Sequence, residues 1–108
     1  MEIRKEKDGN KFIMYVQGAI DTTTSPSLEI EVLEAIKKVK GIEELIIDLS
    51  NTNYVSSAGL RVFLKTHKQL DSMGGKFIIK HPREEVMEVF DMTGFSTFLT
   101  IEEWFYES

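Results

Sequence analysis

The spacing of apolar residues divides the first part of the chain into two strands and a helix. Residues 3–7 and 11–17 are rich in β-forming side chains, and the Asp8 to Asn10 segment between them is a hairpin signal. Apolar residues then recur at helical spacing from Leu28 to Val39, and Ser25 followed by a proline is typical of a helix N-terminus. We therefore expect a β-hairpin followed by a helix that Ser25 caps.

The rest of the chain predicts an alternation of strands and helices. Residues 45–49 are a short β-branched run of the kind that is buried on both faces of a sheet. The further elements expected are a helix from Ser57 to Gly74, a strand at 76–80, a helix from Pro82 to Gly94, a strand at 97–99, and a short terminal helix that opens with the capping-box spacing of Thr100 and Glu103. The order β-β-α-β-α-β-α-β-α predicts an α/β fold in which about four α-helices pack on a mixed sheet of four to five strands.

Composition indicates a globular protein and excludes several classes of function. The 108 residues suit a single domain over 1–108, and the absence of cysteine excludes disulfides and cysteine–zinc sites. Eighteen acidic residues against thirteen basic ones give a net charge of −5, which argues against nucleic acid as a partner. The sequence shows neither a leader-like start nor an apolar run long enough to span a bilayer. We expect a cytoplasmic protein without direct membrane insertion and without a cofactor.

Two serines at the start of the second predicted helix are the strongest candidates for a functional site. The polar loop after residues 45–49 ends in Ser56 and Ser57, where a hydroxyl lies beside unpaired N–H groups and the positive end of the helix dipole. One serine could cap the helix while the other is a turn residue. Alternatively, Ser57 is an exposed phosphoacceptor, on which a phosphate would add about −1.5 to −2 charges. The small Ala58 and Gly59 would leave this corner accessible.

Hydrolytic and metal chemistry are weaker interpretations. Asp21, Asp48, His67 and His81 allow a catalytic triad with a serine to be written, but the chain lacks a G-x-S-x-G motif, and His67 belongs to the apolar stripe of its helix. The two histidines do not have metal-ligand spacing. We expect a protein that is not an enzyme and has no metal site; a nucleotide-binding or hydrolytic role would require a pocket with converging polar groups near Ser57.

Three further features each have two interpretations. Asp21, which ends the segment Gly18 to Asp21, either makes a local Asx-type turn or joins a contact surface at the same sheet edge as the serine loop. Arg61 either reaches back toward a phosphate on Ser57 or is solvated. The aromatic end, Trp104 to Tyr106, either packs on the body of the protein or forms a docking patch.

Three segments resemble the STAS domain family (sulfate transporter and anti-sigma-factor antagonist) in order and spacing. They are Gly18 to Asp21, Asp48 to Leu60 and Phe90 to Phe95, and the second is the most specific. The stand-alone members that they resemble are anti-sigma factor antagonists. The resemblance implies that the unphosphorylated protein binds an anti-sigma factor with serine kinase activity and so frees the sigma factor. Phosphorylation by that kinase would release the protein, and a serine phosphatase of the metal-dependent type would restore binding.

The family motif places the phosphoacceptor at Ser57, and Gly59 matches the family glycine. Ser56 stands where an aspartate is common and Ala58 where a second hydroxyl is common, which makes Ser56 an alternative acceptor. The resemblance implies a partner-binding surface made of Asp21, Asp48, Asn53, Val55, Ser56, Ser57, Ala58, Gly59 and Arg61. We expect a monomer or a weak dimer.

The same resemblance leaves a second function open. STAS-like domains also serve as small subunits of membrane transport assemblies, including ABC-type lipid-trafficking ones, and of large stress-signalling complexes. Co-purification with an ABC-type ATPase would indicate a transport subunit.

Overall fold

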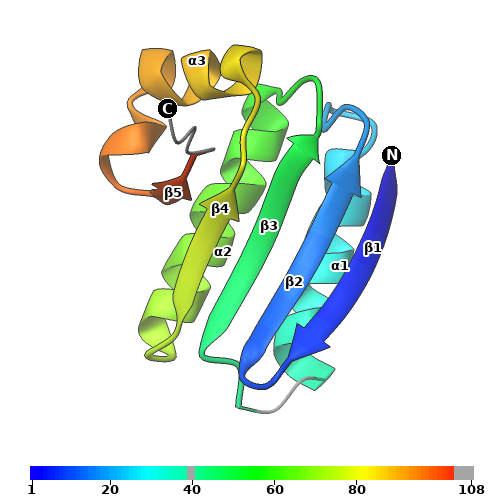
Figure 1. Cartoon of the computed structure of the whole chain (residues 1–108), viewed down its shortest axis with the longest axis vertical. Helices are drawn as coiled ribbons and strands as arrows, with labels where there is room; N and C mark the ends of the chain where they lie inside the picture. The colour runs from blue at the N-terminus through cyan, green and yellow to red at the C-terminus, as the bar shows by residue number, and fades with distance from the viewer. Residues whose placement is uncertain (39–40, 104–108) are drawn as a thin grey trace, which may run out of the picture.

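Five strands form one mixed sheet, and helices pack against it and across its end (Figure 1). The structure is a computed structural model that describes residues 1–38 and 41–103. The strands are β1 Glu2–Asp8, β2 Lys11–Gln17, β3 Glu44–Asn51, β4 Lys76–Lys80 and β5 Thr100–Glu102. The helices are α1 Ser25–Lys38, α2 Ser57–Ser72, α3 Glu84–Thr93 and the 3-10 helix η1 Phe95–Thr97. The α/β class and the mixed sheet agree with the sequence prediction, and the described residues form three α-helices rather than about four.

β1 and β2 form the predicted hairpin at one edge of the sheet. They pair antiparallel, and the pair Asp8 and Lys11 closes a two-residue loop in which Gly9 has a φ of +60°. Glycine adopts this left-handed conformation without steric cost. From β2 onward each strand is parallel to its neighbour in the order β2-β3-β4-β5. The carboxyl ends of β2, β3 and β4 therefore meet at one end of the sheet (Figure 1).

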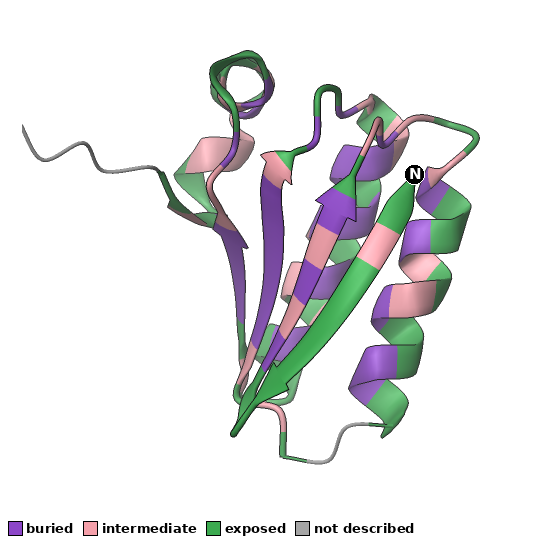
Figure 2. Ribbon diagram, turned by 45° about the vertical axis from the view of Figure 1, so that its right-hand side comes forward, coloured by how far each residue is buried: buried purple, intermediate pink, exposed green. Residues whose placement is uncertain are grey.

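The hydrophobic core lies between the sheet and the helices α1 and α2, which cover the same face (Figures 1 and 2). Alternate residues of the central strands point into it, as the period of two in a strand requires. The strand residues concerned are Phe12, Met14, Val16, Leu45, Ile47, Leu49, Phe77 and Ile79. Phe63 of α2 and Phe90 of α3 are fully buried with ring centroids 6.0 Å apart, so α3 is tied to the same core.

No α-helix of the described residues covers the opposite face of the sheet (Figure 1). One cross-strand row on this face is polar, because Asp48 pairs with Tyr15 on one side and with Lys80 on the other. A carboxylate on an uncovered face would ordinarily be solvated, yet Asp48 is only 7% exposed. Its burial indicates that neighbouring side chains hold it in place.

The predicted strand at 97–99 is wrong by a few residues. Gly94 ends α3 with a φ of +80°, the chain makes the single turn of η1, and Thr100 then comes into register with Ile78 of β4. Phe95 packs against the core at this turn, which delays the strand until the chain has returned to the sheet edge.

The terminal helix predicted to open at Thr100 is also wrong in its first turn. Residues Thr100–Glu102 pair with Ile78, Ile79 and Lys80 as β5, so a sheet edge satisfies backbone groups that a helix would have used. The part of that expected helix with Trp104 and Phe105 lies outside the described residues.

The third predicted helix starts two residues later than expected. Arg83 occupies the N-cap position and α3 begins at Glu84, while Pro82 is buried in the preceding connection. Glu84 and Glu85 do lie in the first turn, where acidic side chains suit the helix dipole. Ser25, predicted to cap α1, is instead its first residue.

Candidate functional site

The connections that follow β2 and β3 are hydrogen-bonded to each other at the carboxyl end of the sheet. The N–H of Ile20 donates to the carbonyl of Tyr54 at 2.8 Å, and the N–H of Ser56 donates to the carbonyl of Ile20 at 2.8 Å. Ile20 and Val55 also form a parallel bridge. We call residues 51–59 the serine corner. Backbone hydrogen bonds thus place the segment that ends in Asp21 against it.

The two serines have different environments. Ser56 is the N-cap of α2, with extended backbone angles and an Oγ that accepts a hydrogen bond from the Gly59 N–H at 3.3 Å. This bond satisfies one of the orphan donors of the first helical turn. Ser57 is the first residue of the helix and is exposed. The arrangement assigns the cap to Ser56 and leaves Ser57 accessible beside the helix N-terminus.

Asp21 makes the Asx-type turn that was one of its two interpretations. Its Oδ1 accepts the N–H groups of Thr23 and Thr24, each at 2.9 Å. These donors, led by the Thr24 N–H, hold the pKa of the Asp21 carboxyl below its ordinary value. Ser25 begins α1 by donating its N–H to the Asp21 carbonyl at 2.8 Å. Asp21 thus shapes the loop beside the serine corner.

Val55 and Gly59 of the serine corner are buried. A Cβ added to Gly59 would lie 2.7 Å from Cγ2 of Ile20 and 3.0 Å from Cγ1 of Val55. The glycine therefore permits close packing inside the protein, not access for a partner as its small size suggested. Val55 is 2% exposed, so its side chain belongs to the same internal contact. Both residues thus take part in the internal packing of the corner.

Asp48 is held by a cluster that links β3 to the connection after β4. Its Oδ1 accepts hydrogen bonds from the Ser50 N–H at 2.9 Å and the Ser50 hydroxyl at 2.7 Å. Its Oδ2 lies 2.9 Å from Nδ1 of His81. The N–H of His81 donates to the carbonyl of Glu102 at 2.8 Å. This side-chain cluster explains the low exposure of Asp48.

The sequence analysis missed the roles of His81 and Arg83. Arg83 Nε donates to the carbonyl of Ser50 at 2.9 Å, which adds a second link between the β4–α3 connection and β3. The position of both residues follows from the sheet, because Lys80 ends β4 and pairs with Asp48 in the parallel register. The residues that follow Lys80 must then pass the carboxyl end of β3. Placing His81 and Arg83 beside Asp48 and Ser50 from the sequence would therefore require knowing that β3 and β4 are neighbours.

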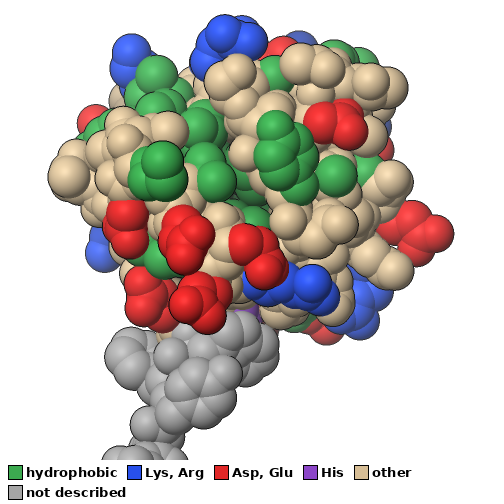
Figure 3. Space-filling view, turned by 90° about the horizontal axis from the view of Figure 1, so that it is seen from above, with side chains coloured by type: hydrophobic (Ala, Val, Ile, Leu, Met, Phe, Trp, Pro, Cys, Tyr) green, Lys and Arg blue, Asp and Glu red, His purple; other side chains and the backbone are tan. Residues whose placement is uncertain are grey.

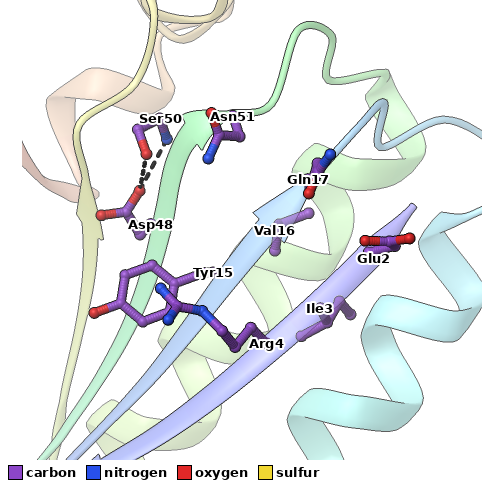
Figure 4. Close-up of a pocket in the computed structure, with 9 residues that line it drawn as sticks. All are labelled: Glu2, Ile3, Arg4, Tyr15, Val16, Gln17, Asp48, Ser50 and Asn51. Atoms are coloured by element: carbon purple, nitrogen blue, oxygen red, sulfur yellow. Dashed lines mark hydrogen bonds between the residues drawn. The ribbon is translucent and has the colours of Figure 1, made fainter.

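A shallow cavity of about 230 Å³ opens on the uncovered face of the sheet beside Asp48 (Figure 4). Its lining is Glu2, Ile3, Arg4, Tyr15, Val16, Gln17, Asp48, Ser50 and Asn51. The guanidinium of Arg4 lies over the Tyr15 ring, 4.3 Å from the centroid. The lining mixes both signs of charge, and both carboxylate oxygens of Asp48 already have partners, so the cavity indicates no particular ligand.

The remaining predicted site residues lie at the surface around the serines. Asn53 and Arg61 are exposed and Ala58 is partly exposed. Ala58 and Arg61 line a groove of about 150 Å³ between α1 and α2, together with Lys65. Lys65 bridges the two helices through Glu29 at 3.0 Å. Arg61 follows Ser57 by one helical turn, which is the spacing at which side chains on a helix meet.

Acidic side chains gather on one side of the end face that carries the carboxyl ends of the strands (Figure 3). α3 contributes the exposed Glu84, Glu85, Glu88 and Asp91. Tyr54 of the serine corner is 52% exposed, so the corner presents an aromatic side chain three positions before Ser57. The serine corner itself thus combines hydroxyl, amide and aromatic groups.

The histidines do not assemble a site for hydrolysis or for a metal in the described residues. His67 is half-buried on α2 with its ring centroid 6.0 Å from that of Phe98, as expected for the edge of a core. His81 contacts Asp48, whose other oxygen is bonded to Ser50 and not to Ser57. No group of three or more potential metal ligands occurs in the ranges that the structure describes. Within the same ranges, no helix is both long and apolar enough to cross a bilayer.

Comparison with known proteins assigns the family. The family model described as the STAS domain matches residues 2–108, and the chain belongs to this family. BtrV of Bordetella bronchiseptica is 33% identical over 95 residues, which cover 88% of this chain and 80% of BtrV. An anti-sigma-B factor antagonist of Listeria monocytogenes is 32% identical over 98 residues, covering 91% of this chain and 84% of the relative.

A solved structure shows the same fold at low sequence identity. The Bacillus cell fate determinant SpoIIAA in its phosphorylated form superposes with a TM-score of 0.71 at 16% identity, covering 93% of this chain and 90% of SpoIIAA. The fold predicted from the sequence resemblance is therefore confirmed.

Proposed function

We propose that this protein is an anti-sigma factor antagonist whose binding is controlled by phosphate on Ser57. The Listeria relative is named an anti-sigma-B factor antagonist. The structure of SpoIIAA in a phosphorylated form supports a phosphate switch in the family. The observation that carries the proposal is that the two serines have different structural environments. Ser56 is committed to the helix cap, while Ser57 is exposed at the first helical position.

The helix start supports a phosphate that leaves the fold unchanged. The first-turn N–H groups of α2 that lack intrahelical partners lie beside Ser57, and the positive end of the helix dipole favours an added negative charge. Arg61, one turn further on, is a cation that could also face the phosphate. The modified protein can thus accommodate the charge locally.

A bound partner would experience the same charge differently. A surface shaped for a neutral serine would have to desolvate about −1.5 to −2 charges without a compensating cation. We infer that the partner is an anti-sigma factor with serine kinase activity and that phosphorylation releases it. A serine phosphatase of the metal-dependent type would then reset the switch. In this proposal the protein acts in the cytoplasm as a binding partner and not as a catalyst.

The proposed contact surface is smaller than the set of residues that the sequence motif suggests. Asp21, Asn53, Ser57, Ala58 and Arg61 are at least partly exposed and are available to a partner. The side chains of Asp48 and Val55 and the backbone of Gly59 are buried, and we assign these residues a supporting role. Exposed Tyr54 is added to the surface, because a half-exposed aromatic ring is a common anchor in protein interfaces.

The test is a paired capture of partners from native lysate with wild-type protein and the Ser57→Asp variant. We expect a serine kinase of the anti-sigma type to be retained by wild type and lost by Ser57→Asp, with the melting temperature nearly unchanged. Ser57→Ala should retain the kinase and take up no phosphate. Equal retention by wild type and Ser57→Asp would contradict the proposal.

Ser56→Ala is the matched control for the hydroxyl itself. It removes the cap, so it should lower the free energy of unfolding by about 1 kcal/mol and leave phosphate incorporation in place. Loss of phosphate in Ser56→Ala, together with uptake by Ser57→Ala, would move the acceptor to Ser56. Recovery of an ABC-type ATPase by both baits would favour a transport subunit instead.

A further inference from the structure

We propose that His81 is a positioning residue for the serine corner and acts through Asp48. The sequence motif does not contain the contact between His81 and Asp48, since His81 lies 33 positions after Asp48 and follows a different strand. The inference deepens the proposed function by naming what holds the phosphoacceptor loop on its β4 side.

The chain of contacts from His81 to the corner is short. Nδ1 of His81 lies 2.9 Å from Oδ2 of Asp48, and Oδ1 of the same carboxylate accepts both the N–H and the hydroxyl of Ser50. Ser50 is the last residue before the corner begins at Asn51. A carboxylate bonded at both oxygens is restrained in its rotation, so it restrains the position at which the backbone at Ser50 enters the corner.

The backbone of His81 indicates that this contact is maintained against a cost. Its φ is +56°, and it is the only residue other than glycine with a positive φ in the described parts of the chain. A non-glycine residue in this conformation is sterically disfavoured and persists only where surrounding contacts fix it. Within the described residues, these contacts include the N–H bond to the Glu102 carbonyl and the side-chain contact with Asp48.

In the described part of the chain, charged neighbours of the cluster come from three elements. Lys80 precedes His81 and pairs with Asp48 across β4 and β3, and Lys80 Nζ lies 3.4 Å from a Glu102 carboxylate oxygen on β5. Arg83 reaches the Ser50 carbonyl from the start of α3. His81 is therefore the member of the cluster that contacts the Asp48 carboxylate directly from the β4–α3 connection, and Arg83 supports the same backbone position.

Two substitutions separate the side-chain contact from the backbone conformation. His81→Gly removes the imidazole at a position where glycine adopts the required φ without strain. Asparagine, in His81→Asn, also tolerates the left-handed region, and its side-chain NH₂ is three bonds from Cα, as is Nδ1 of histidine. The asparagine can thus restore the donor to Asp48, while the glycine cannot. An alanine would confound the two effects through its φ.

The measurement is amide hydrogen exchange on the isolated full-length protein, resolved at Ser50 and at residues 52–56. We expect His81→Gly to accelerate exchange there by roughly tenfold, the change that corresponds to losing one hydrogen bond to a charged group. Exchange at Ile46 and Ile47 in the centre of β3 should change much less. His81→Asn should return the corner to within about twofold of wild type, which purely structural packing of the imidazole would not do.

Two outcomes would overturn the inference. Unchanged exchange at the corner in His81→Gly would show that Asp48 holds Ser50 without the histidine. Equal acceleration in His81→Gly and His81→Asn would show that ring packing, and not the bond to Asp48, is what matters. The inference rests on the proposed function only for its biological consequence. Because exchange needs no partner and no phosphate, a failure of Ser57 to be phosphorylated would be seen separately and would leave this result standing.

Discussion

The serine corner is held differently on its two sides. On the β2 side the contacts are mostly backbone hydrogen bonds, from Gly18 to Asn51, from Ile20 to Tyr54 and from Ser56 to Ile20. On the β4 side they are side-chain contacts made by His81 and Arg83. Backbone bonds are available to nearly any sequence, whereas side-chain bonds depend on particular residues. The β2 side thus defines the corner for the fold, and the β4 side is where a given sequence can adjust it.

The largest effect should come from Gly59, where the β2 side is packed most closely. Gly59→Ala would place a Cβ 2.7 Å from Ile20 and 3.0 Å from Val55, so the two connections would have to separate. We expect the free energy of unfolding to fall by about 1–3 kcal/mol, even though alanine favours a helix more than glycine does. Chemical denaturation of Gly59→Ala and wild type measures this difference in the free energy of unfolding.

Gly75→Ala is the control for this substitution. A Cβ there would make ordinary contacts, the closest at 3.4 Å from the Glu43 carbonyl oxygen, and Gly75 does not have a positive φ. Its effect should stay within about 1 kcal/mol of wild type, as for a substitution that introduces no serious overlap. Equal losses in the two variants would show that the corner is not packed more tightly than an ordinary turn.

Thr52 provides a buried side-chain bond on the β2 side. Its Oγ1 donates to the Val16 carbonyl at 2.9 Å, and the residue is fully buried. Thr52→Val should lower the free energy of unfolding by about 1–2 kcal/mol because the hydrogen bond between two segments is lost.

Thr66→Val is the matched comparison, since Thr66 is also buried and its Oγ1 donates to the Val62 carbonyl one turn back in α2. That bond joins no two elements, so its loss should cost less than that of Thr52, of the order of 0.5 kcal/mol. A larger loss of stability in Thr66→Val than in Thr52→Val would show that the bond between the two segments is not the more important one. Thermal or chemical unfolding of both variants supplies the comparison.

Arg83 tests the β4 side with a smaller expected effect. Arg83→Met keeps most of the aliphatic side chain and removes the bond from Nε to the Ser50 carbonyl. Because this bond is exposed, we expect a loss of at most about 1 kcal/mol of stability, together with faster amide exchange in residues 52–56. Arg61→Met changes an exposed arginine on α2 and should leave exchange at the corner unchanged. Indistinguishable amide exchange in the two variants would show that the bond from Arg83 to Ser50 does not help to hold the serine corner.

Asp21 should make the smallest difference, and one that depends on pH. Its carboxylate accepts the Thr23 and Thr24 N–H groups, and the pKa of the folded protein's Asp21 is lowered, so the ionised form stabilises the fold. This contribution is complete above the unfolded pKa of about 3.9 and is lost as the pH falls through the lower folded value. Asp21→Asn should therefore differ from wild type at pH 7 and approach it at acid pH. A difference independent of pH would contradict this assignment.

The sequence predicts most of the fold because apolar periodicity is a local property. The segments around Leu45 to Leu49 and Leu28 to Ile36 were assigned correctly from spacing alone. Ser56 and Ser57 were found for the same reason, since helix starts carry local signals. The role of Gly59 was misjudged because its neighbours Ile20 and Val55 meet only in the folded chain.

The pairing of Asp48 with His81 could not be predicted in the same way. It depends on β3 and β4 being neighbours in parallel register, which is a property of the whole sheet. The position of β5 has the same origin, because the register with Ile78, and not the propensity of residues 97–99, decides where the last strand forms. Local patterns thus identify the elements and the helix start, while contacts between strand ends require the topology.

The hairpin strand β1 has a consequence for how this protein meets other molecules. It is an edge strand, six of its seven residues are charged, and all except Ile3 are exposed. A bare sheet edge invites further strands from other chains, and a dense row of charges opposes that pairing. Lys5 in addition forms an ion pair with Glu31 of α1, which anchors the strand to the body. Polymerisation through this edge is therefore disfavoured, and association through the serine corner, as proposed above, would not compete with strand pairing along β1.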